Sequence, residues 1–157
     1  ARAIAAGFSS DRIVFSGVGK REDELRSAIA ARIGHVNVES MAELDVLARL
    51  ASEATSPVPV GIRVNPDVTA DTHPYISTGQ SGIKFGIPAD QVLDAAKFIV
   101  AHPRLELASL AMHLGSQLLE VGPYQEGLAL LLRLVDQLRT GGVTDPTQMG
   151  VSMTTTS

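Results

Sequence analysis

The clearest indication of the fold is the segment Val58-Pro-Val-Gly-Ile-Arg-Val-Asn65, because it predicts a strand with two very different faces. Successive side chains of a strand point to opposite sides of the sheet. One face is wholly apolar and the other is small or polar, with Val60, Ile62 and Val64 on the first and Gly61, Arg63 and Asn65 on the second. An open parallel sheet covered by helices on both sides would need two apolar faces. The pattern therefore favours a barrel, in which only the outer face packs against helices.

Three further predicted strands repeat this pattern, and helical patterns separate all four. The strands are Ile13–Phe15, His35–Glu39 and Leu107–Met112, and the helices span residues 22–33, 40–51, 88–101 and 123–140. Such alternation predicts a parallel sheet with right-handed crossovers. No Gly-x-Gly-x-x-Gly follows a strand, which argues against a dinucleotide-binding open sheet. Since a complete barrel needs about 250 residues, we predict an α/β fold, a partial (β/α)8 TIM-type barrel of about four consecutive parallel βα units.

Several local features of these elements can also be predicted. Ser40 followed by Glu43 is typical of a capping box, Pro88 fits the first position of a helix, and Lys20 fits a solvated residue at a helix start. The apolar stripe of the last helix is predicted to consist of Tyr124, Leu128, Leu131, Leu132, Val135 and Leu138. The outer strands, residues 13–15 and 107–112, would leave two unpaired sheet edges.

Polar residues gather at the C-terminal ends of the predicted strands, and they are Ser16, Glu39, Arg63, Asn65 and His113. In barrel enzymes this rim carries the active site. Without a ligand, Arg63 is expected to form an ion pair with Glu39. His113 could serve as a hydrogen-bonded structural histidine or contact a ligand.

An unusually long connection follows the strand that ends at Asn65 and runs to about Ile87. Long loops that carry reactive side chains often act as lids or binding loops. We predict a substrate or lid role for the residues of this loop that carry such groups, His73, Tyr75, Ser77, Thr78 and Lys84. The alternative is a surface excursion without a role.

Composition argues against several classes of protein. The 157 residues carry a formal net charge of −4, which argues against nucleic-acid binding, and include no cysteine, which excludes disulfides and thiolate chemistry. No apolar run reaches the roughly 20 residues of a membrane span. We expect a cytoplasmic protein without a metal, nucleic-acid or membrane partner.

Six motifs carry a resemblance to a known family, and they are Phe15–Lys20, Asn37–Ser40, Arg63–Pro66, His73–Gly79, Lys84–Ile87 and His113–Gln117. In their order and spacing the chain resembles the diaminopimelate decarboxylases, which belong to the alanine-racemase-like barrel group and use pyridoxal 5'-phosphate (PLP). The resemblance covers roughly residues 5 to 143. Ornithine and arginine decarboxylases match more loosely, because they share the histidine motif but not the His73–Gly79 loop.

The resemblance implies a PLP-dependent lyase that decarboxylates meso-diaminopimelate to L-lysine, the last step of lysine biosynthesis. It implies a small-molecule amino-acid substrate and a homodimer. It also implies that His113 stacks on the cofactor ring, that Ser116 contacts the phosphate, and that Arg63 lies beside the ring. On the residues alone, Ser116 could instead cap a turn.

The resemblance further implies parts that this chain lacks, above all the lysine that forms the Schiff base with the cofactor. We therefore expect no catalytic residue here and expect the chain alone to be inactive. Residues 1–143 are interpreted as a partial PLP-binding barrel domain, and residues 144–157 as a divergent, disordered tail. Two alternatives stay open: a non-catalytic barrel fragment, and a related PLP barrel decarboxylase of the ornithine or arginine type.

Overall fold

The computed structural model describes residues 2–65, 85–116, 121–143 and 149–156, and the strands in these segments form one sheet. Neighbouring strands follow the order β1-β2-β3-β5-β6, with the short β4 paired to β3 outside this path, and every pairing is parallel. The strands are β1 (Val14–Phe15), β2 (His35–Val38), β3 (Val58–Asn65), β4 (Ile87–Pro88), β5 (Leu105–Ser116) and β6 (Gly150–Thr156).

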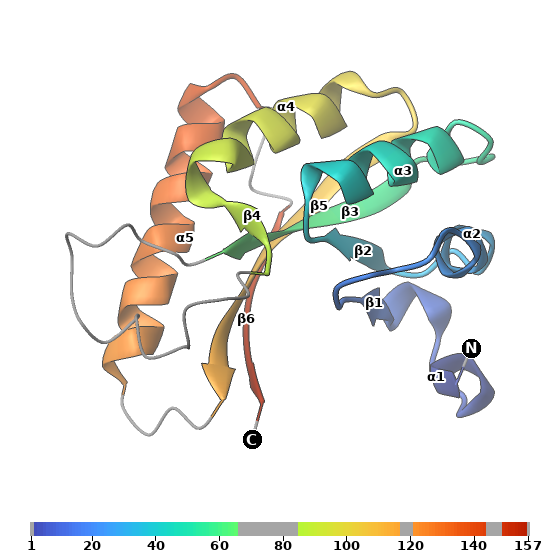
Figure 1. Ribbon diagram of the computed structural model, residues 1–157, viewed down its shortest axis with the longest axis horizontal. Coiled ribbons are helices and arrows are strands. Elements are labelled where there is room, and N and C mark those ends of the chain that lie inside the picture. The colour runs from blue at the N-terminus through green and yellow to red at the C-terminus, as the bar shows by residue number, and fades with distance from the viewer. Residues whose placement is uncertain (1, 66–84, 117–120, 144–148, 157) are drawn as a thin grey trace.

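The helices lie along one side of this curved sheet and form an arc around it (Figure 1). They are α1 (Arg2–Ala5), α2 (Glu22–Ala30), α3 (Met41–Ala51), α4 (Val92–Ala101) and α5 (Gly122–Thr140), with short 3₁₀ turns at Ser10–Arg12 and Ala89–Gln91. A parallel sheet with helices on one side and a polar opposite face is the geometry of part of a barrel. The prediction of a partial α/β barrel is therefore confirmed.

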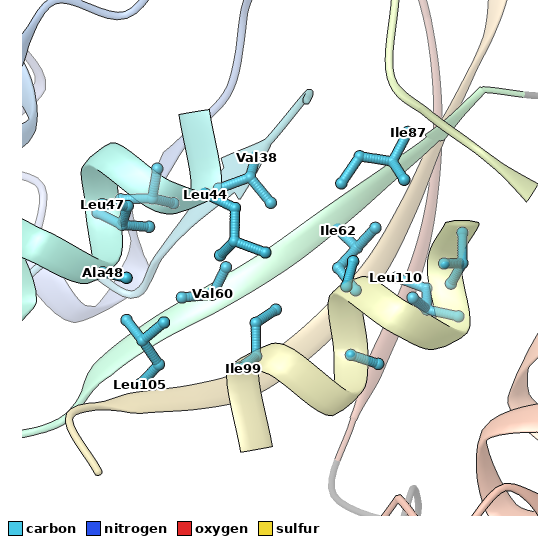
Figure 2. Close-up of a cluster of buried hydrophobic side chains, with 14 of the residues drawn as sticks. Val38, Leu44, Leu47, Ala48, Val60, Ile62, Ile87, Ile99, Leu105 and Leu110 are labelled. Atoms are coloured by element: carbon cyan, nitrogen blue, oxygen red, sulfur yellow. The ribbon is translucent and has the colours of Figure 1, made fainter. Parts of the chain in front are cut away.

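The hydrophobic core lies between the helices and the apolar face of the sheet. Figure 2 shows Leu44 of α3 and Ile99 of α4 pointing toward the central strand, where they meet Val60 and Ile62. All four of these side chains are fully buried. Burying a side chain of this size stabilises the fold by roughly 1.5–3 kcal/mol. The apolar face predicted for residues 58–65 is thus the face that holds the helices.

The predicted starts of two helices are only partly correct. Glu43 N–H donates to Ser40 Oγ at 3.1 Å, as a helix cap requires, but the Glu43 carboxylate accepts from the backbone of Glu39 instead of completing the box at Ser40. Pro88 does not begin a helix. It ends β4, a 3₁₀ turn follows it, and α4 begins at Val92.

The predicted apolar stripe of α5 is wrong at two positions. Leu128 and Leu132 are 41% and 52% exposed, whereas Leu134, which the stripe omits, is buried. The buried face passes through Gly127, where an added Cβ would lie 2.8 Å from Leu114 of β5. Because this glycine lets the helix approach the sheet closely, it selects the side of α5 that packs.

The segment predicted to be a disordered tail contains a strand. β6 pairs with β5 in parallel register from Ser109↔Gly150 to Ser116↔Thr156, so the prediction is wrong for residues 150–156. Valine and threonine favour strands, and β5 offers an edge on which they can pair. The edge predicted to be open at residues 107–112 is consequently covered. Residues 144–148 and 157 lie outside the described segments.

Candidate functional site

Arg63 and Glu39 meet at the C-terminal ends of β3 and β2, on the polar side of the sheet. Arg63 Nη1 donates to Glu39 Oε2 at 2.7 Å, and the side chains are only 16% and 4% exposed. The backbone N–H of Gly17 donates to the other carboxylate oxygen at 2.7 Å. The Arg63 guanidinium also lies 5.9 Å from the centre of the Phe85 ring. The ion pair predicted for the ligand-free protein is confirmed, and it connects the loop after β1 with two strand ends.

Lys20 is buried, so its prediction as a solvated residue is wrong. Its side chain is 1% exposed, and its ammonium donates to the carbonyl oxygens of Gly17 and Asn37, each at 2.7 Å. It also lies 3.1 Å from both carboxylate oxygens of Glu43. The backbone turns at Gly17 and Gly19, which have φ angles of 117° and 70° and bring the lysine back under the rim. These two glycines were the sequence signal for a tight turn.

A second polar layer lies deeper on the same face. His35 Nε2 lies 3.1 Å from Ser109 Oγ, and the amide nitrogen of Asn37 lies 3.5 Å from Ser16 Oγ. Within the described part of the chain, Asn37 Oδ1 is buried without a hydrogen bond. Gly61 lies among these groups, and its missing side chain leaves the space that they occupy. This layer forms the floor below Arg63 and Glu39.

Acidification is expected to destabilise the wild-type chain more than a His35→Gln variant. Burial lowers the pKa of His35. Since the unfolded value is about 6.5, the unfolded state binds more protons as the pH falls through this range. The stabilisation from a neutral His35 is therefore complete above about pH 6.5 and is lost below it. Urea denaturation at about pH 7.5 and 5.5 measures the effect, and an equal loss in both proteins would contradict it.

His113 lies on the same face of the sheet as Arg63. The register of β3 and β5 places Arg63 opposite Ala111, and His113 is two residues further along β5. His113 is partly exposed, and its Nδ1 lies 3.2 Å from Thr154 Oγ1 of β6. Adjacent strands therefore bring an imidazole and a guanidinium to one end of the polar face.

The remaining predicted site residues are less completely described. Ser116 ends β5 opposite Thr156, and the placement of its side chain is outside the description. The loop residues His73, Tyr75, Ser77, Thr78 and Lys84 lie outside the described residues. In the segments that the structure describes, no three His, Cys, Asp or Glu side chains cluster in a way that could hold a metal ion. None of the helices in these segments combines the length and the hydrophobicity that a membrane span needs.

The chemistry of this rim suits an anionic, aromatic ligand. A guanidinium is well suited to binding oxygen anions, and an imidazole can lie flat against a second ring. PLP has both a phosphate and a pyridine ring, so the residues present fit the cofactor that the sequence resemblance implies. Arg63 could bind an oxygen of this cofactor, and His113 could lie against its ring.

Comparisons with known proteins agree on one group of enzymes. The family "Pyridoxal-dependent decarboxylase, pyridoxal binding domain" matches residues 1–148. The chain is 38% identical over 141 residues to the diaminopimelate decarboxylase of Zymomonas mobilis, covering 90% of this chain and 34% of that protein. It is 44% identical over 142 residues to the Pseudomonas aeruginosa enzyme of the same name, again covering 90% and 34%.

Two solved structures resemble the fold closely. The diaminopimelate decarboxylase of Helicobacter pylori, complexed with L-lysine, has a TM-score of 0.79 at 37% identity, covering 90% of this chain and 36% of that one. The M. jannaschii enzyme, in co-complex with L-lysine, has a TM-score of 0.84 at 30% identity, covering 96% and 35%. The chain thus spans about a third of the length of the relatives it matches.

Proposed function

Because the chain belongs to the pyridoxal-dependent decarboxylases and matches their pyridoxal-binding domain, we propose that it is the cofactor-binding part of a diaminopimelate decarboxylase. The whole enzyme would decarboxylate meso-diaminopimelate to L-lysine in lysine biosynthesis. It would act in the cytoplasm as a homodimer. The chain alone would be inactive, because it is about a third of such an enzyme.

One observation carries this proposal: Arg63 and His113 lie on one face at the C-terminal ends of adjacent parallel strands. Relatives of about 40% identity named diaminopimelate decarboxylase support the substrate. The L-lysine found in two related structures supports it further, because L-lysine is the product of that reaction.

The residues of this chain would bind and orient the cofactor. His113 would stack on the pyridine ring, Arg63 would lie beside it, and Ser116 would contact the phosphate. The loop that carries His73, Tyr75, Ser77, Thr78 and Lys84 would lie at the mouth of the pocket and contact the substrate. When bound, PLP supplies the electron sink for decarboxylation.

Cofactor binding can be tested on the chain itself. We expect equilibrium dialysis to detect saturable PLP binding, and a His113→Ala variant to bind at least about fivefold more weakly, because a ring contact is worth about 1 kcal/mol. His102→Ala is the matched control, since that histidine follows α4 on the helical side of the sheet. Equal affinities in all three proteins would contradict the proposed site.

Substrate choice requires a complete enzyme. A chimera in which this chain replaces the matching third of the Pseudomonas aeruginosa relative should release L-lysine from meso-diaminopimelate. The His113→Ala change should reduce this activity strongly. Turnover of ornithine or arginine in place of diaminopimelate would instead support the related decarboxylases.

A further inference from the structure

We propose that Lys20 is a positioning residue that fixes the Arg63 guanidinium at the rim, through a closed ring of hydrogen bonds around Glu39. The inference rests on the proposed function, in which Arg63 lies beside the cofactor. It gives a role to the buried ammonium of Lys20, which is not among the residues proposed to contact the cofactor.

The Lys20 ammonium has no hydrogen left for a ligand. A lysine ammonium carries three donors, and here they meet three partners: the carbonyl oxygen of Gly17, the carbonyl oxygen of Asn37 and the carboxylate of Glu43. Burying a charge is costly unless it is paired and hydrogen-bonded. Here the charge is paired with Glu43 and all three N–H groups are hydrogen-bonded, so the lysine acts on its protein neighbours and not on a substrate.

The partners of Lys20 hold Glu39 from two sides. Glu43 Oε2 accepts from the backbone N–H of Glu39 at 2.8 Å, and the N–H of Gly17 donates to Glu39 Oε1 at 2.7 Å. Since Lys20 binds both Glu43 and Gly17, the hydrogen bonds form a ring that starts and ends at its ammonium. The ring fixes both the backbone and the carboxylate of Glu39.

Arg63 connects this ring to the surface of the site through its ion pair with Glu39. The second oxygen of Glu39 accepts from Arg63, whose side chain is 16% exposed compared with 1% for Lys20. The position of the guanidinium thus depends on Glu39, and the position of Glu39 depends on Lys20. Removing the lysine charge would also leave Glu43, 11% exposed, without its ion pair.

A Lys20→Met variant tests this role in the 157-residue chain, which at 16.5 kDa is small enough for side-chain NMR. In the wild type, the Arg63 Nη–H signals should be resolved and slow to exchange, because Glu39 holds them. In Lys20→Met they should collapse into the averaged arginine signals. PLP affinity should fall about fivefold, the factor expected from the loss of one hydrogen bond. Lys97→Met, on the exposed side of α4, should change neither readout.

Resolved Arg63 signals in a folded Lys20→Met protein would overturn the proposal. Should that variant fail to fold, Glu43→Gln gives the same test, because it weakens the same ring while preserving side-chain shape. Absence of PLP binding in the wild type would count against the proposed function, whereas the NMR result decides the role of Lys20 by itself.

Discussion

Replacing Gly61 with alanine is expected to lower the free energy of unfolding by about 2–3 kcal/mol, the cost of forcing an extra group into a filled interior. A Cβ at this position would lie 3.0 Å from His35 Cδ2 and would collide with Asn37 Oδ1 and Ser109 Oγ. These neighbours are side chains of β2 and β5, so they would have to rotate out of the positions that they hold in the polar layer. The His35–Ser109 contact of 3.1 Å would be lost as well.

Chemical denaturation in urea measures this effect, with the slope of the transition checked for constancy. Gly150→Ala is the matched control, because Gly150 is also a strand glycine and a Cβ there would make only ordinary contact, 3.6 Å from Ser109 Cβ. We expect the control to keep the wild-type midpoint within error. Equal destabilisation by the two changes would show that loss of strand glycine, and not the polar layer, sets the cost.

The two-faced pattern of β3 made the fold predictable from the sequence. Alternation along residues 58–65 correctly separated the helix-facing side from the polar side, and the predicted pairing of Arg63 with Glu39 followed from their places at neighbouring strand ends. Both inferences depend only on strand periodicity and parallel order, which a sequence records directly.

Features that depend on three-dimensional approach could not be predicted in this way. The helix α5 has leucines on several sides, and its packed face is chosen by the close approach at Gly127. Lys20 is buried because a turn at two glycines brings it back to the rim, where it binds Glu43 and two carbonyl oxygens. The strand β6 pairs along the edge that β5 offers, although it lies beyond residues 1–148, which the family matches.

Replacing Glu39 with glutamine is expected to cost about 3 kcal/mol of unfolding free energy, because it leaves the buried Arg63 charge without its partner. The glutamine would also turn an amide NH2 toward a donor, either Arg63 Nη1 or the N–H of Gly17, since both carboxylate oxygens now accept hydrogen bonds. An exposed ion pair makes a useful contrast. Glu22 pairs with Arg49 and Arg26 at the surface, so Glu22→Gln should change the stability little.

A double-mutant cycle separates the pair from its surroundings. Arg63→Met should also destabilise the chain, but the Glu39→Gln, Arg63→Met double variant should lose about 1–2 kcal/mol less than the sum of the single losses. The coupling arises because each single change leaves the other charge buried without its partner, whereas the double change removes both charges. Strict additivity would mean that the two side chains act independently despite their 2.7 Å contact.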